Sequence, residues 1–167
     1  MLSFKKLWAS HPTVKGEQPL LDKKTYENQC AINLHAAFER SGVNLKTFHG
    51  QLSWQKDKPK YAIRAQELAN WLASPFSGMH RAEKFSGQEV FDKIQGKGII
   101  YFQNFWGPGN QGDHIDLWNG SRLTDRRSWA RIHLRIGSFG VHSVIPDVSD
   151  LQKSQSVWFW PVSEPVG

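Results

Sequence analysis

The chain has 167 residues, of which 39% are hydrophobic and 22% are charged, and its formal net charge is +6. This composition is typical of a globular protein and argues against a disordered or fibrous chain, while the basic balance favours anionic partners. One cysteine excludes an internal disulfide, and no segment approaches the roughly 20 apolar residues of a membrane span. We interpret residues 1–167 as one domain.

The first 21 residues are expected to form an irregular arm, because Pro12, Gly16 and Pro19 interrupt any regular pattern. A short helical piece is predicted around residues 3–8. The arm lacks the continuous apolar run and the small-residue cleavage site of a secretory signal peptide. We therefore expect a protein that is made in the cytoplasm and does not use ordinary export.

Three helices are predicted after the arm. The first spans about residues 28–40, where apolar residues recur at helical spacing, and the second spans about residues 61–72. A capping box at its start introduces the third helix, at about residues 86–94. The only cysteine, Cys30, falls in the first turn of the first helix.

Extended segments follow from Gly98 onward, and the Asn119-Gly120 pair between two of them is a strong turn signal. Helices followed by antiparallel strands predict an α+β fold, with N-terminal helices packed on an antiparallel sheet. The candidate strands, identified by apolar runs or by period-two alternation, are residues 99–102, 114–118, 132–136 and 157–160.

The position of Cys30 is the most informative feature of the sequence. Unpaired N–H groups and the helix dipole favour a negative charge at a helix N-terminus. The thiolate is the nucleophilic form of cysteine, and this setting favours it. Cys30 is therefore either a reactive nucleophile or a small residue that only packs.

A cysteine nucleophile needs a base, and His114 is the best candidate. It opens a predicted strand directly after the glycine-rich residues 107–113, where small side chains leave room for a substrate. No zinc-binding spacing includes His114 and Asp116, so no metal is expected. The remaining histidines lie in contexts that suggest surface or packing roles: His11, His35, His49, His80, His133 and His142.

Three segments carry a family resemblance: Asn-Gln-Cys-Ala-Ile at 28–32, His-Ile-Asp-Leu-Trp-Asn-Gly at 114–120 and Ser-Val-Trp-Phe-Trp-Pro at 156–161. From about Tyr26 onward the chain resembles the type VI secretion amidase effectors, family four, and more broadly the papain-like NlpC-type peptidoglycan amidases. The resemblance implies a cysteine amidase that cuts the γ-D-glutamyl to meso-diaminopimelate bond of peptidoglycan stem peptides. It also implies delivery by the type VI secretion apparatus into a recipient Gram-negative periplasm, a cognate immunity protein as partner, and no cofactor.

On this resemblance, a Cys-His-Asp triad maps onto Cys30, His114 and Asp125. A strand that returns across the Asn119-Gly120 turn would bring Asp125 beside the imidazole. Asp116 is the rival, because residues i and i+2 of a strand share a face, although such neighbours sit about 6–7 Å apart and seldom bond directly. A residue such as Asn119 is the remaining alternative for the third position.

The expected mechanism assigns proton transfer to His114 and attack on the amide carbon to Cys30, through a thioester that water hydrolyses. The backbone N–H of Cys30 and a neighbour such as Asn28 or Gln29 are expected to stabilise the oxyanion. Trp106 is the predicted groove wall for the stem peptide, because the glycine and proline residues that follow cannot cover it.

A second class of function stays open on the sequence alone. A cell-wall or polyanion-binding module, nucleic acid included, would use the basic surface and the aromatic residues, while Cys30 merely packs. The two interpretations differ in one experiment. A binding module keeps its ligand affinity after Cys30→Ala, whereas an amidase loses product formation and remains folded.

Overall fold

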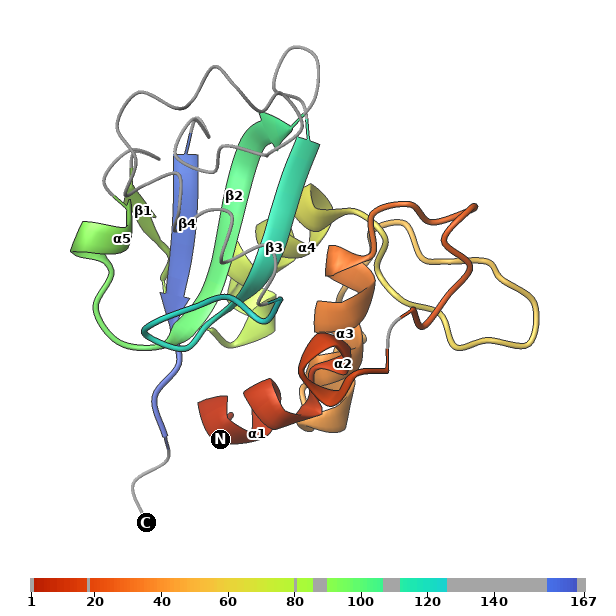
Figure 1. Ribbon diagram of the computed structural model, residues 1–167, viewed down its shortest axis with the longest axis horizontal. Coiled ribbons are helices and arrows are strands. Elements are labelled where there is room, and N and C mark those ends of the chain that lie inside the picture. The colour runs from red at the N-terminus through yellow and green to blue at the C-terminus, as the bar shows by residue number, and fades with distance from the viewer. Residues whose placement is uncertain are drawn as a thin grey trace.

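The protein was analysed as a computed structural model that describes residues 2–17, 19–79, 81–85, 90–106, 112–125 and 156–164. Within these residues, the larger helices lie on one side of a four-stranded sheet (Figure 1). The helices precede most of the strands in the chain, and all neighbouring strands are antiparallel. The predicted α+β fold, with N-terminal helices packed on an antiparallel sheet, is confirmed.

The helical part begins with two short helices that pack beside a longer one. These are α1 (Phe4–Ser10), α2 (Pro12–Lys15) and α3 (Cys30–Arg40), followed by α4 (Ala65–Ala73), the 3-10 turn η1 (Pro75–Ser77) and α5 (Val90–Lys93). Cys30 is the first residue of α3, as the sequence predicts. Among the described residues, no helix has the length and apolar character needed to cross a bilayer.

The sheet has the strand order β1-β4-β2-β3. Its strands are β1 (Glu83–Phe85), β2 (Gly98–Trp106), β3 (Gly112–Trp118) and β4 (Ser156–Pro161). The C-terminal strand β4 is therefore inserted between two earlier strands. In the described part of the chain β3 is an edge strand, so groups from the helical part can approach it from beyond the sheet.

Both faces of the sheet are buried, which explains the continuous apolar run of β2. Successive side chains of a strand point to opposite faces. Ile99 and Tyr101 belong to a cluster with α3 and α4, whereas Ile100 and Phe102 pack with Val90 of α5. Burial of a large apolar side chain contributes about 1.5–3 kcal/mol, so this double coverage fixes the strand that pairs with β3.

A glycine permits the close pairing of the two central strands. Gly98 is in register with Pro161 of β4, and a Cβ atom at this position would collide with the Trp160 carbonyl group. A larger residue would separate β2 from β4. The geometry of β3 depends on this packing, because β2 pairs with it from Gly98 to Trp106.

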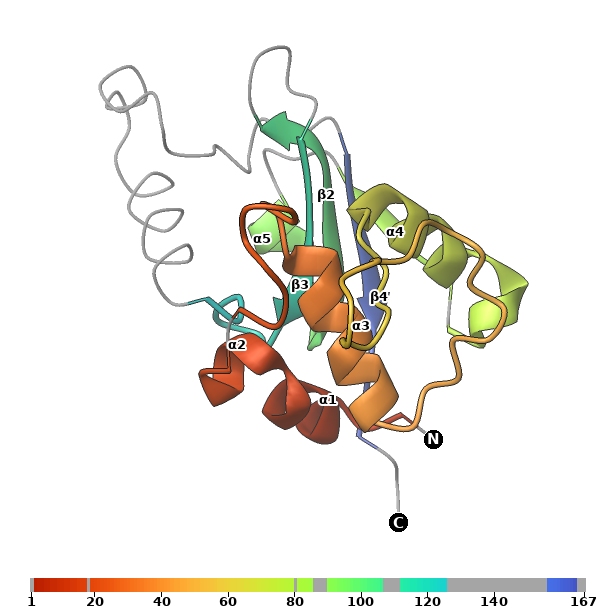
Figure 2. The ribbon, with the colours of Figure 1, turned by 90° about the vertical axis from the view of Figure 1, so that its right-hand side faces the viewer.

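The N-terminal arm is more ordered than the sequence suggests. Phe4 and Leu7 of α1 are buried in the cluster that also contains α3, so the arm contributes to the core. Arg40 at the end of α3 donates to the Ser10 carbonyl at 2.9 Å and pairs with Glu17 at 2.7 Å. Figures 1 and 2 show α1 and α2 beside α3. The short helical piece predicted around residues 3–8 is confirmed as α1, whereas the following part of the arm, expected to be irregular, contains α2.

Other predicted boundaries differ in detail. The helix expected from residue 61 starts at Ala65, because Ala62 forms a β-bridge with Leu52. The Asn119-Gly120 turn is present, with Gly120 at φ 95°, and up to residue 125, where the described segment ends, the returning chain forms one bridge, from Trp118 to Leu123. The short polar strand β1 was not predicted. The candidate strand at 132–136, and residues 86–89 of the expected third helix, lie outside the described residues.

Candidate active site

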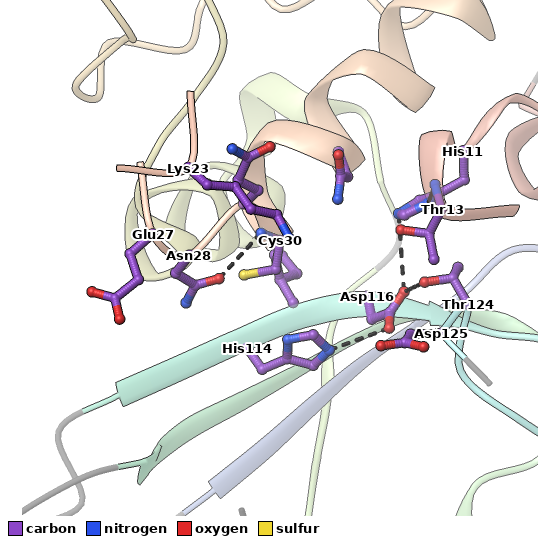
Figure 3. Close-up of a pocket in the computed structure, with 13 residues that line it drawn as sticks. His11, Thr13, Lys23, Glu27, Asn28, Cys30, His114, Asp116, Thr124 and Asp125 are labelled. Atoms are coloured by element: carbon purple, nitrogen blue, oxygen red, sulfur yellow. Dashed lines mark hydrogen bonds and ion pairs between the residues drawn. The ribbon is translucent and has the colours of Figure 1, made fainter. Parts of the chain in front are cut away.

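A pocket of about 550 Å³ opens between the start of α3 and the edge strand β3. Figure 3 shows Cys30 and Asn28 on one side, His114 and Asp116 on the strand, and His11 with Thr124 beyond them. These side chains come from four separate stretches of the chain. The pocket therefore exists only because α3 and the arm pack against β3.

The Cys30 thiol is partly exposed and lines the pocket. Its backbone N–H donates to Asn28 Oδ1 at 3.1 Å, which satisfies one of the free donors at the start of α3. Asn28 Nδ2 in turn donates to the Asp113 carbonyl of β3 at 3.2 Å. Asn28 thus links the start of α3 to the strand that carries His114.

His114 stands beside the sulfur and opposite Phe102 of β2, with which it is in register and stacked at a centroid distance of 6.2 Å. Its side chain is 20% exposed, so a substrate in the pocket can reach the ring. Burial would lower the pKa of His114. Hydrogen bonds with Asp116 and Cys30, together with the negative charge of both, outweigh burial and raise that pKa to about 10. The imidazole is therefore cationic at neutral pH.

Asp116 holds the other side of the imidazole. Its Oδ2 atom lies 3.2 Å from His114 Nε2, so these i and i+2 neighbours do bond directly, unlike the general expectation for strands. Its Oδ1 atom accepts from the Leu117 N–H at 2.7 Å and from Thr124 Oγ1 at 2.5 Å. Burial would raise the pKa of Asp116, but the hydrogen bond and the charge of His114 keep it below the usual value. Cys30, His114 and Asp116 form what we call the side-chain row.

His11 is the residue that sequence reasoning missed. It was expected to have a surface or packing role, yet it is 2% exposed, lines the pocket and has Nε2 4.0 Å from Asp116 Oδ1. Burial lowers the pKa of His11 to about 4, although the carboxylate of Asp116 opposes this change. The available signal was the His11-Pro12 pair, because proline is common at the first position of a helix and His11 caps α2.

Asp125, the predicted third residue, lines the same pocket as Cys30 and His114. The turn after β3 folds back through the bridge from Trp118 to Leu123, which brings Asp125 next to the strand. Figure 3 draws Asp125 among the residues that line the pocket, together with Asp116 and Thr124. The hydrogen bond to His114 Nε2 described above belongs to Asp116, and both carboxylates line one pocket.

The other predicted residues have distinct positions. Asn28 is at the pocket, with its amide bonded to Cys30 and to β3. Gln29 lines the pocket too, but its Nε2 donates to the Leu21 carbonyl at 2.7 Å and to the Tyr26 carbonyl at 3.3 Å. Trp106 ends β2, and its side chain lies outside the described part of the structure.

The arrangement brings together the groups that nucleophilic catalysis needs. A thiol at a helix start touches a cationic imidazole, and a buried carboxylate orients that imidazole. Within the described residues, no group of three or more histidine, cysteine or carboxylate side chains is placed to hold a metal ion. The thiol, imidazolium and carboxylate in this arrangement can perform thiolate attack and proton transfer.

Comparison with solved structures finds the same fold in effectors from two bacteria, and three of these structures illustrate it. An effector from Enterobacter cloacae, in the type VI effector–immunity complex Tae4–Tai4, has a TM-score of 0.63 and 20% identity, over 98% of this chain and 99% of that chain. The Salmonella typhimurium effector of the Tae4/Tai4 system has a TM-score of 0.62 and 17% identity, over 97% and 99%. The Enterobacter cloacae effector Tae4 solved by itself has a TM-score of 0.62 and 18% identity, over 98% of both chains.

Family comparison extends this likeness from fold to sequence. No curated protein sequence matches the chain. A family model described as type VI secretion system, amidase effector protein 4, matches residues 26–160, which include every member of the side-chain row. The protein is therefore an amidase effector of type VI secretion, and the chain belongs to the Tae4 family.

Proposed function

We propose that this amidase hydrolyses the γ-D-glutamyl to meso-diaminopimelate bond of peptidoglycan stem peptides, with Cys30 as nucleophile. The observation that carries the proposal is the contact between Cys30 and His114, whose pKa is raised to about 10. A thiolate beside an imidazolium is the reactive form of a cysteine hydrolase. A binding module in which Cys30 only packs gives no reason for this contact.

The reaction proceeds in two steps. The Cys30 sulfur attacks the amide carbon, and His114 protonates the amine of diaminopimelate as the C–N bond breaks. The acyl group of D-glutamate then stays on Cys30 as a thioester. Neutral His114 removes a proton from water, the hydroxide attacks the thioester, and the thiolate leaves, which restores the starting pair.

The oxyanion requires donors near the sulfur, and the backbone N–H of Cys30 is the first of them. This N–H is bonded to Asn28 Oδ1 in the free protein. A substrate carbonyl oxygen that displaces Asn28 Oδ1 accepts the hydrogen bond from the Cys30 N–H. Rotation of the Asn28 amide would then present its Nδ2 as a second donor. Gln29 Nε2 already donates to two carbonyl groups, whereas Asn28 Nδ2 donates to one, that of Asp113, so Asn28 is the better second donor.

Asp116 is the carboxylate that we assign to orient His114, because its Oδ2 accepts from Nε2 at 3.2 Å. Asp125, which the family resemblance indicates, stays a prediction for this role and lines the same pocket. Trp106 also stays a prediction as a groove wall. Separate substitutions of the two carboxylates assign the third position.

We further propose that the effector acts in the periplasm of a recipient Gram-negative cell and is neutralised in the producer by an immunity protein. The solved relatives named above include complexes of the effector Tae4 with the immunity protein Tai4. An immunity protein of this kind should abolish peptidoglycan cleavage at equimolar concentration. An inhibitor that binds but leaves cleavage unchanged would contradict this partner assignment.

The function is tested with purified Gram-negative peptidoglycan under reducing conditions, with muropeptides identified by mass spectrometry. The expected products are stem peptides that end at D-glutamate. The matched control is Cys30→Ala, which should leave every stem peptide intact while retaining the fold. Intact stem peptides with the wild-type protein, or cleavage at a different amide bond, would refute the proposed substrate bond.

A further inference from the structure

His11 lies outside the part of the chain that matches the family, yet its backbone is firmly held. It connects α1 to α2, and Arg40 of α3 bonds to the carbonyl of the preceding Ser10 at 2.9 Å. The imidazole is 2% exposed and lines the pocket beside Asp116. A buried polar ring in this position needs a defined set of partners.

Its first partner fixes the position of the proton on the ring. The Thr13 N–H donates to His11 Nδ1 at 3.1 Å, so Nδ1 is an acceptor and carries no hydrogen. In a neutral imidazole the hydrogen is then on Nε2. Burial keeps the ring neutral, because it lowers the pKa of His11 to about 4.

Its second partner is the carboxylate that orients His114. His11 Nε2 lies 4.0 Å from Asp116 Oδ1, so the positive end of the N–H dipole is close to the carboxylate. This distance exceeds that of a hydrogen bond, but attraction between a dipole and a charge is strong in a buried site. The other charged groups that act on His11 are His114 and Arg40.

A neutral His11 ring and a cationic His11 ring would act differently on the pair of Asp116 and His114. A second positive charge beside Asp116 would offset the effect of the carboxylate on His114. A neutral Nε2–H supports the carboxylate and leaves its negative charge available to the imidazolium. The tautomer set by Thr13 and the burial of the ring both favour this neutral state.

We propose that His11 is a positioning residue: its Nε2–H keeps Asp116 ionised and turned toward His114, and so maintains the imidazolium that partners Cys30. The part of this inference that concerns turnover rests on the proposed function. The part that concerns the Cys30–His114 pair rests on the geometry alone. The rival interpretation is that His11 serves only to cap α2.

Two substitutions separate these roles. The side-chain amide of an asparagine can reach the place of Nδ1, and asparagine is among the best N-cap residues, so His11→Asn keeps the cap and loses the contact with Asp116. A glutamine amide reaches the place of Nε2 but is a poorer cap, so His11→Gln keeps the contact and weakens the cap. The two variants therefore preserve opposite functions of one side chain.

The primary measurement is the rate of alkylation by iodoacetamide at pH 6, which is specific because Cys30 is the only cysteine. The rate in His11→Gln should stay near the wild-type rate, whereas in His11→Asn it should fall about two- to tenfold, the range expected for one weak polar contact. The melting temperature should follow the opposite order, with His11→Gln the less stable variant. Against peptidoglycan, His11→Asn should lower kcat at unchanged KM.

Equal alkylation rates in all three proteins, or rates that follow the melting temperatures, would reduce His11 to a helix cap and overturn the proposal. A ¹⁵N-edited spectrum of the wild-type protein gives an independent test at pH 6. A neutral ring with its proton on Nε2 supports the proposal, and a cationic ring or a proton on Nδ1 overturns it. Neither measurement depends on peptidoglycan cleavage, so a wrong substrate assignment would not be mistaken for a wrong role of His11.

Discussion

The two ends of the side-chain row differ in their access to solvent. At the carboxylate end, Asp116 and His11 are 3% and 2% exposed, and protein groups surround Asp116. At the sulfur end, Cys30 lines the pocket and the His114 side chain is 20% exposed. The difference indicates that the protein fixes the carboxylate completely and leaves the nucleophile for the substrate to cover. Substitutions at the two ends should accordingly fail in different ways.

The largest effect on activity is expected at the sulfur end. Cys30→Ala removes the nucleophile, and cleavage of stem peptides should fall roughly 10⁴-fold or more. The free energy of unfolding should change little, since the thiol is partly exposed and is not itself one of the buried core residues. The measurements are muropeptide release and urea denaturation. A variant that still cleaves peptidoglycan would show that Cys30 is not the nucleophile.

Asp116→Asn tests the carboxylate end. The asparagine amide would direct an N–H group at His114 Nε2 and destabilise the imidazolium, so kcat should decrease roughly 10²- to 10⁴-fold. Oδ1 still accepts from Leu117 and Thr124, so the variant should fold.

Asp125→Asn is the matched control, because Asp125 lines the same pocket. A smaller loss than that of Asp116→Asn is expected if Asp116 orients the imidazole. The reverse order of the two kcat values would assign the third position of the triad to Asp125. Equal losses would show that both carboxylates support His114.

The pH dependence of activity should follow the titration of His114, at the sulfur end of the side-chain row. Protonated His114 is the acid that releases the amine, and its contacts with Asp116 and Cys30 raise its pKa to about 10 against the effect of burial. Activity in kcat/KM should therefore persist through pH 9 and fall as the pH rises through about 10. In Asp116→Asn the same fall should occur at lower pH. An unchanged alkaline limit in that variant would separate Asp116 from the titration of His114.

The pH dependence of stability should depend on His11 at the carboxylate end. Whereas activity is lost as the pH rises, stability should be lost as the pH falls. Burial lowers the pKa of His11 to about 4, against about 6.5 in the unfolded chain, so the unfolded state takes up a proton between these values. The free energy of unfolding should be unaffected by His11 above pH 6.5 and should decrease as the pH falls toward 4.

His11→Asn should make this decrease shallower by about one proton in urea denaturation series. His35 also has a pKa lowered by burial, but its contribution is the same in both proteins and cancels in the comparison. Parallel curves for the two proteins would mean that His11 is not buried as a neutral group.

The same division explains how much the sequence could predict. Cys30 and His114 could be singled out because a helix start and a strand start are local signals, and the structure places both at one pocket. The contacts of the carboxylate end depend on the packing of the arm against α3 and on the turn after β3, and neither is encoded in a local pattern. No local signal therefore placed His11 at the pocket, and the choice of Asp125 over Asp116 for the third position stays a prediction. The short strand β1 was missed for a related reason, because its polar residues are specified by pairing with β4.

The smallest effect on activity is expected from the removal of one hydroxyl group at the carboxylate end. Thr124→Val keeps the shape of the side chain but removes the donor to Asp116 Oδ1, a bond of 2.5 Å. Loss of a hydrogen bond to a charged group costs about 1.5–3 kcal/mol, and kcat should fall a few-fold because Oδ1 keeps the Leu117 N–H. Thr47→Val is the control. Thr47 Oγ1 accepts a hydrogen bond from Trp71 Nε1 at 2.9 Å, and Thr47 is not one of the residues that line the pocket. Both variants should lose stability in urea denaturation, and only Thr124→Val should lose activity. Full activity in Thr124→Val would mean that the carboxylate end does not need its full set of donors to hold His114. A loss of activity in both variants would attribute the effect to general destabilisation.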